Sequence, residues 1–230
     1  MLFINGQHAG NGGTSAYWEG YDLRAMAQLG DLSARYIDGA MGGWSTTFAW
    51  GLTPLKSNID PATRFLLGRL QGIANAEDIV RNLVDGETIK IVTHSMGTGF
   101  ARGYTQGIMM WARANGLEHK IRFEYGVDIN PFQGALFPAD GNVERSETMM
   151  GGLDGGTSTP LLEPQKALEM LRGNSVPSVA LTPNAKNITD PADASKGHAV
   201  VKMSTRVLPN LGNGGEARKV EQGNNNENNP

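Results

Sequence analysis

The sequence predicts an α/β fold with a mostly parallel sheet flanked by helices. Two observations predict it. Apolar runs of strand length alternate along the chain with stretches of helical periodicity, an order that produces a parallel sheet covered on both faces. The 230 residues are 39% hydrophobic and 19% charged, which is enough for one buried core. We expect one domain over residues 1–208 and a disordered, Gly- and Asn-rich tail over residues 209–230.

Four elements are expected in the first third of the chain. Apolar runs predict strands over residues 2–5 and 34–38, with a helix over residues 21–29 between them. A Gly-rich loop, residues 6–13, follows the first strand, and residues 42–60 are expected to form a loop over the sheet edge. Pro61 begins a helix that ends at Asp85-Gly86. Its spacing predicts one buried face, formed by Phe65, Leu66, Leu70, Ile73, Ile79, Val80 and Leu83.

The remaining elements follow the same alternation. A strand over residues 88–93 leads through a turn at residues 94–96 into a long helix over residues 97–114, which Asn115-Gly116 ends. Further strands are expected over residues 120–127, 142–150 and 176–182. Pro164 suits the first turn of a helix and Gly173 its end, so a helix is expected over residues 163–172.

Composition excludes several classes of function. The net charge of −3 is unlike the basic face of a nucleic-acid-binding protein. The absence of cysteine excludes disulfides and thiolate metal sites, and the four histidines show no metal-ligand spacing, so we expect no metal and no cofactor. The glycines after the first strand do not form a dinucleotide fingerprint. No apolar run reaches the roughly 18 residues of a membrane span, and the first residues do not resemble a signal peptide.

The stretch around Ser95 carries the strongest functional signal. A buried strand runs into a sharp turn and then into a helix, with Ser95 at the turn and Gly97 two positions later. This pattern is typical of a nucleophile elbow, which presents a serine hydroxyl at the carboxyl end of a sheet. The usual pattern has glycine on both sides, whereas Thr93 occupies the first position here. The N–H of Met96, at the start of the helix, is predicted to be one donor of an oxyanion hole.

Several motifs resemble known hydrolases. Thr93-His94-Ser95-Met96-Gly97, followed by Phe100-Ala101-Arg102-Gly103-Tyr104, resembles the elbow of a lipase-type α/β-hydrolase. Val127-Asp128-Ile129-Asn130-Pro131-Phe132 resembles the acid-bearing turn of pancreatic-type lipases. Together with Phe3-Ile4-Asn5-Gly6, Gln133 and Gly197-His198, these motifs resemble lipase-like domains at the ends of bacterial rearrangement-hot-spot (RHS) repeat proteins. The resemblance covers residues 2–202 and implies a small α/β-hydrolase fold. It also implies that the domain is delivered as part of a larger effector protein. The sequence itself shows no targeting signal.

The resemblance implies a Ser-His-Asp triad in the chain order serine, acid, histidine. Only His198 suits that order as general base for Ser95. Asp128 is the first candidate for the acid and Asp154 the alternative, while Asp190 and Asp193 also stay open. The second oxyanion donor is expected in the loop after the first strand, at Gln7 or His8.

The predicted function is the hydrolysis of an acyl ester or lipid through an acyl-enzyme, as in a lipase or esterase. Two alternatives stay open at this point. A catalytically degenerate binding module is suggested by Thr93, and a thioesterase, amidase or acyltransferase would use the same triad. Trp44, Phe48, Trp50, Met109 and Trp111 are candidates for contacts with an acyl chain, although the last two suit a core as well.

Overall fold

A parallel sheet forms the centre of the computed structural model, which describes residues 1–6, 11–40, 61–132, 134–151, 182–193, 200 and 203–211. Within these residues the sheet has the strand order β2-β1-β3-β4-β5-β6, and every neighbouring pair is parallel. The strands are β1 (Leu2–Asn5), β2 (Arg35–Asp38), β3 (Ile89–His94), β4 (Phe123–Ile129), β5 (Val143–Met149) and β6 (Lys186–Asn187). The α/β class with a mostly parallel sheet is therefore confirmed.

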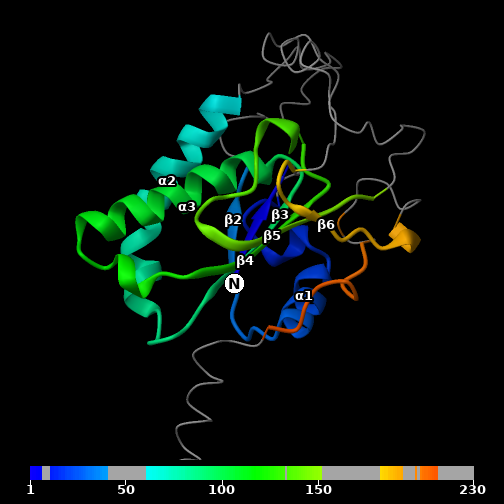
Figure 1. Ribbon diagram of the computed structural model, residues 1–230, viewed down its shortest axis with the longest axis horizontal. Coiled ribbons are helices and arrows are strands. Elements are labelled where there is room, and N and C mark those ends of the chain that lie inside the picture. The colour runs from blue at the N-terminus through cyan, green and yellow to red at the C-terminus, as the bar shows by residue number, and fades with distance from the viewer. Residues whose placement is uncertain are drawn as a thin grey trace, which may run out of the picture.

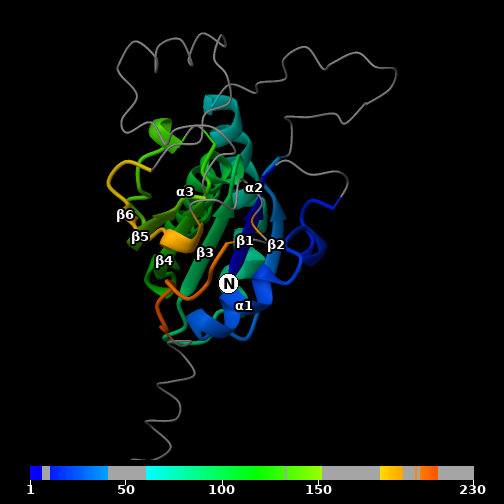
Figure 2. The ribbon, with the colours of Figure 1, turned by 90° about the vertical axis from the view of Figure 1, so that its right-hand side faces the viewer.

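Helices cover both faces of the sheet. α2 (Pro61–Asn82) and α3 (Gly97–Ala114) lie on one face, and α1 (Tyr21–Leu29) lies on the other together with residues 203–211 (Figures 1 and 2). Short 3₁₀ turns occur at η1 (Ser15–Tyr17), η2 (Glu118–Lys120), η3 (Gly134–Leu136) and η4 (Pro191–Asp193). Among the described residues, no helix is both long and apolar enough to cross a membrane.

The strands contribute to two apolar cores because successive side chains of a strand point to opposite faces. Phe3 and Val92 face α1, whereas Ile4 and Ile91 face α2 and α3. All four side chains are at most 3% exposed. Burial on both faces explains why these strands read as continuous apolar runs and not as an alternating pattern.

Glycines allow α2 and α3 to pack backbone against backbone. A Cβ added at Gly72 would lie 2.2 Å from the carbonyl oxygen of Tyr104, and one added at Gly103 would lie 1.9 Å from that of Phe65. Gly68 and Gly107 lie equally close to the opposite helix. No other residue type fits this contact without moving the helices apart.

The predicted buried face of α2 was partly wrong. Ile79 and Val80 are buried, but Leu66 and Leu70 are 43% and 56% exposed. The buried stripe instead follows residues spaced four apart along the helix, namely Arg64, Gly68, Gly72 and Ala76. The spacing of large apolar residues failed here because glycine, which counts as neutral in such a pattern, makes the contact.

The other differences are at element boundaries. The strand expected from residue 120 begins at Phe123, because residues 118–120 form a 3₁₀ turn after α3. It also extends to Ile129, so that Asp128 lies within β4 and not after it. β6 was not predicted. The loop expected over residues 42–60, the helix over 163–172, the strand over 176–181 and most of the tail (residues 212–230) lie outside the described residues.

Candidate active site

Ser95 forms a strained turn between β3 and α3. Its φ of 55° lies in the left-handed region, which costs a residue with a side chain about 1–2 kcal/mol. Two hydrogen bonds hold the turn: Ser95 N–H donates to the carbonyl of Ile129 at 2.9 Å, and Phe132 N–H donates to the carbonyl of Ser95 at 3.0 Å. The serine is thus fixed in the conformation expected of an elbow. We call residues 93–97 the elbow from here on.

Two glycines let the end of β1 lie against the elbow. A Cβ at Gly97 would lie 2.4 Å from the carbonyl oxygen of Ile4, so the small residue predicted after the serine is required there. A Cβ at Gly6 would lie 2.6 Å from the Cβ of Ser95 and 3.0 Å from the nitrogen of Met96. The backbone of Gly6 therefore forms one wall beside the serine.

The elbow lies at the topological switch point of the sheet. From β1 the chain moves outward to β2, and β3 then adds on the opposite side of β1. In open parallel sheets, ligands bind outside the carboxyl ends of the strands at such a point. Gly6 and Ser95 follow the carboxyl ends of β1 and β3, the two strands that flank this point.

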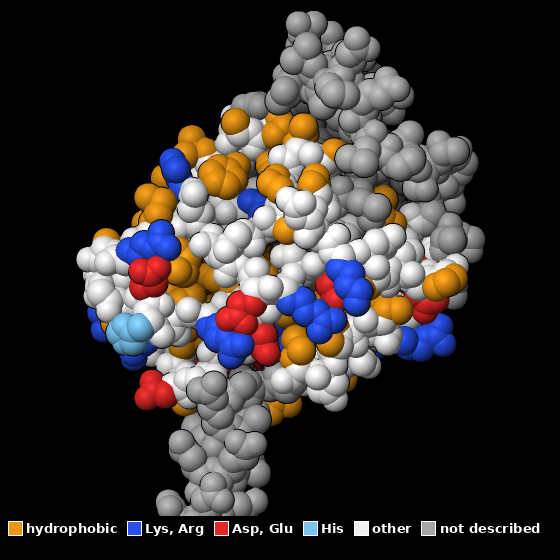
Figure 3. All heavy atoms as spheres, viewed as in Figure 1, with side chains coloured by type: hydrophobic (Ala, Val, Ile, Leu, Met, Phe, Trp, Pro, Cys, Tyr) orange, Lys and Arg blue, Asp and Glu red, His pale blue; other side chains and the backbone are white. Residues whose placement is uncertain are grey.

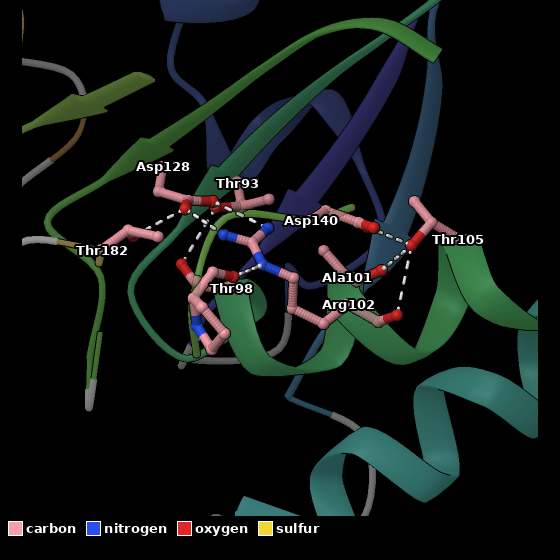
Figure 4. A network of polar contacts seen from close by, with 9 residues as sticks. Thr93, Thr98, Ala101, Arg102, Thr105, Asp128, Asp140 and Thr182 are labelled. Atoms are coloured by element: carbon pink, nitrogen blue, oxygen red, sulfur yellow. Dashed lines mark hydrogen bonds and ion pairs between the residues drawn. The ribbon is translucent and has the colours of Figure 1, made fainter. Parts of the chain in front are cut away.

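Thr93, which departs from the usual elbow pattern, has a defined role. Its side chain is buried, and its hydroxyl donates to Asp128 Oδ1 at 2.7 Å and contacts the Thr98 hydroxyl at 3.0 Å (Figure 4). The threonine therefore ties β3 to both β4 and the first turn of α3. Glycine at this position would leave the Asp128 carboxylate without one donor.

Asp128 accepts hydrogen bonds from three directions. Besides Thr93, the Thr182 hydroxyl donates at 2.7 Å, and the Arg102 guanidinium forms an ion pair with both carboxylate oxygens (Figure 4). Arg102 also donates from Nε to the carbonyl of Pro138 at 2.8 Å. Asp128 and Arg102 have side chains that are only 4% and 13% exposed. These contacts are typical of a structural carboxylate and weigh against Asp128 as the partner of a histidine.

Asn130 is a residue of the site that the sequence patterns did not indicate. It follows β4 with a φ of 45°, is fully buried, and accepts the N–H of Gly151 on its Oδ1 at 2.5 Å. Asn130 thereby fixes the chain where it leaves β5, three residues before Asp154. An asparagine after a strand is a usable signal, because Asn tolerates the left-handed region.

Tyr17 and His94 lie on the α1 side of the elbow. The hydroxyl of Tyr17 accepts the N–H of Gly6 at 3.2 Å and is hydrogen-bonded to Nδ1 of His94. Their ring centroids are 5.7 Å apart, and Trp18, which is fully buried, packs against both rings. Burial is the main cause that raises the pKa of Tyr17 far above its ordinary value, so the hydroxyl keeps its proton.

The remaining predicted residues are only partly described. His198, Asp154 and Gln7, and also His8, lie outside the described residues. Met96 is 5% exposed and immediately precedes α3. Among the described residues, no side chain is hydrogen-bonded to the hydroxyl of Ser95.

The loop aspartates both have partners. Asp193 is fully buried and accepts the N–H of Ser204 at 3.0 Å. Asp190 pairs with Arg206 at 3.1 Å.

A cavity of about 500 Å³ opens beside the first turns of α2, between α3 and residues 136–142. Its charged groups are paired within the protein, because Arg102 holds Asp128 and Asp140 accepts from Thr105 and from Asn142. Its wall is otherwise mainly apolar and includes Phe65, Leu136 and Phe137. Hydrophobic side chains gather over this part of the surface (Figure 3). Met109 and Trp111, by contrast, pack against the core between the sheet and the helices.

Comparisons of the chain with protein-family models, with curated proteins and with solved structures find no match in any of the three. Within the described part of the chain, no group of three acidic or histidine side chains is arranged to hold a metal ion. The strand–turn–helix geometry at Ser95 is therefore the basis for assigning a function.

Proposed function

We propose that the protein is a serine hydrolase of the α/β-hydrolase type that cleaves carboxylic esters through an acyl-enzyme. The observation that supports this most strongly is Ser95 itself: a serine with a left-handed backbone, between a buried parallel strand and a helix, at the switch point of the sheet. Such strain is costly, and it is kept where the surrounding contacts enforce it, commonly at functional sites.

In this mechanism the Ser95 hydroxyl attacks the ester carbonyl carbon while His198 takes its proton. The carbonyl oxygen becomes an oxyanion, which the N–H of Met96 and the positive end of α3 stabilise. When the intermediate collapses, the C–O bond of the ester breaks and His198 gives the proton to the departing alcohol. Water then repeats the sequence on the acyl-enzyme, releasing the carboxylic acid and restoring Ser95.

For the triad acid, the contacts of Asp128 favour the alternative, Asp154. A carboxylate paired with a guanidinium is already neutralised, so it would stabilise a histidine cation less well. Asn130 holds the chain at Gly151, three residues before Asp154 in the sequence.

An apolar acyl group is the best supported substrate class. The cavity beside α2 is lined by Arg102 and Gln106 of α3, the helix that begins directly after the elbow, and by no residue of the elbow itself among those described. Because its charged groups are paired internally, it offers an uncharged chain mainly apolar contacts.

The test is hydrolysis of p-nitrophenyl esters of increasing chain length by the native protein and by Ser95→Ala and His198→Ala. We expect turnover by the native protein and a loss of at least about 10³-fold in kcat for each variant, since triad members act as a unit. Thr14→Ala, at an exposed hydroxyl that bonds only to the local backbone, serves as the matched control and should keep full activity. Turnover that survives in Ser95→Ala would contradict the proposal.

A further inference from the structure

The wall of the site formed by Gly6 is held by hydrogen bonds on both sides of that residue. Its N–H donates to the Tyr17 hydroxyl at 3.2 Å, and its carbonyl accepts the side-chain amide of Asn5 at 2.7 Å. Asn5 is fully buried, and its Oδ1 accepts the N–H of Gly13 at 2.7 Å. The two ends of the loop after β1 are thus fixed to the same side chain.

Fixing Gly6 has a consequence for the site because this residue lies beside two parts of the elbow. A Cβ at Gly6 would lie 2.6 Å from the Cβ of Ser95 and 3.0 Å from the nitrogen of Met96, which carries the proposed oxyanion donor. The position of Gly6 therefore bounds the space in which an oxyanion on the serine would form.

The hydroxyl of Tyr17 needs a partner of its own to stay in place. Because its oxygen accepts from Gly6, its hydrogen is available to donate, and Nδ1 of His94 is the acceptor within reach. His94 immediately precedes the nucleophile in the chain and is 5% exposed. The contact therefore joins the loop after β1 to the residue before Ser95.

We propose that Tyr17 and His94 are positioning residues, which hold the Gly6 peptide against Ser95 and against the N–H of Met96, the proposed oxyanion donor. This inference rests on the proposed hydrolase function. Among the described residues, neither side chain is hydrogen-bonded to Ser95. Tyr17 acts through Gly6, and His94 acts through Tyr17.

The first test compares Tyr17→Phe with Tyr21→Phe. Both changes remove a hydroxyl from a tyrosine on the α1 side, where Tyr17 is partly buried and Tyr21 fully buried. The Tyr21 hydroxyl reaches only the sulfur of Met149, at 3.9 Å. Rates are expressed per active site, titrated with a fluorophosphonate, so that unfolded protein does not count.

We expect Tyr17→Phe to lower kcat about tenfold with KM unchanged, less than the 10²–10³-fold for loss of an oxyanion donor itself. Tyr21→Phe should leave kcat within about twofold. A trifluoromethyl ketone, which forms an oxyanion on the serine, should bind Tyr17→Phe more weakly by the same factor as kcat falls.

The second test is a double-mutant cycle with His94→Leu. If His94 acts by holding Tyr17, the double variant should lose no more kcat than the more affected of the two single variants, so the two losses should not multiply. Losses that multiply would show independent roles and overturn the inference for the pair.

The outcomes separate this inference from the proposed function. If the native protein turns over esters and labels at Ser95, but Tyr17→Phe has an unchanged kcat per titrated site, the positioning role is wrong and the hydrolase assignment stands. A fall in thermal stability alone, with kcat per site unchanged, leads to the same conclusion. If the native protein neither turns over esters nor labels, the proposed function fails, and the inference fails with it.

Discussion

Thr93 shows how a single residue can depart from a motif without breaking the geometry that the motif describes. The requirement for a small side chain is strict at Gly97, where a Cβ would meet a carbonyl oxygen of β1 at 2.4 Å. On the other side of the serine, the side chain of Thr93 faces Thr98 and Asp128, and its hydroxyl is used there. The departure therefore does not by itself favour a degenerate site.

The role of Asp128 gives a prediction at the same scale. Asp128→Asn removes the buried partner of Arg102, so we expect the free energy of unfolding to fall by roughly 3–5 kcal/mol. Activity per titrated site should fall by less than about tenfold. Asp154→Asn should instead lower kcat by about 10⁴-fold with little change in stability, as when a triad acid is replaced by its amide.

Urea unfolding and active-site-titrated kinetics of the two variants decide which aspartate is the triad acid. A stable Asp128→Asn protein with a kcat lowered by orders of magnitude would make Asp128 the triad acid after all.

At this scale the sequence predicts best where one residue type is demanded by backbone geometry. The strand–turn–helix over residues 95–97 and the need for glycine at position 97 were predicted and are confirmed. The catalytic roles of Ser95 and Met96 stay predictions. The roles of Asn5, Tyr17 and Asn130 were not predicted, because they depend on hydrogen bonds to residues that are distant in the sequence. Local patterns contain no information about such contacts.

Among the elements, the bounds of α2 and α3 were predicted, but the face through which the two helices pack was not. α3 matches its expected bounds, and α2 begins at Pro61 as expected. The contact face was missed because it consists of glycines at a spacing of four: Gly68 and Gly72 on α2, and Gly103 and Gly107 on α3. That repeated spacing in two neighbouring helices is the signal that could have indicated close packing.

The close glycine contact between α2 and α3 predicts that adding one methyl group there lowers the stability of the protein. Gly72→Ala should gain helix propensity yet destabilise the protein by about 1–3 kcal/mol, because the added methyl group overlaps the carbonyl of Tyr104. Gly141→Ala is the matched control, since a Cβ there would meet no atom within 4 Å and the backbone is not left-handed. This control should be neutral or slightly stabilising.

Thermal unfolding of the two glycine variants measures the difference. A Gly72→Ala protein at least as stable as Gly141→Ala would contradict the packing described.

For the whole molecule, burial of the tyrosines links stability to alkaline pH. Each of the five tyrosines has a raised pKa with burial as the largest cause, and for Tyr36 the value is about 12. In the unfolded chain these groups titrate near 10. Since the raised pKa belongs to the folded state, this contribution to stability is complete below about pH 10 and is lost as the pH rises toward the folded values.

We therefore expect ultraviolet difference spectra of the native protein to show little phenolate near pH 10, with phenolate appearing together with unfolding at higher pH. Denaturant unfolding at several pH values should give a free energy that falls above about pH 10. Reversible titration of several tyrosines near pH 10 in the folded protein would contradict the burial described.

The overall topology brings the parts of the site together from distant segments. The strand order places the ends of β1 and β3 side by side, and Gly6 and Ser95 follow them directly. The alternation of strands and helices predicted the parallel sheet, but not its strand order. That order decides which loops meet at the elbow, and long-range pairing is not encoded in any local pattern.

The most direct test of the central claim is covalent labelling of the folded native protein with a fluorophosphonate. We predict that the intact mass rises by one phosphonyl group, that peptide mapping places the group on Ser95, and that Ser95→Ala and the urea-unfolded chain remain unlabelled. A folded native protein that stays unlabelled, or one that carries the label on another residue, would contradict the assignment of Ser95 as the nucleophile.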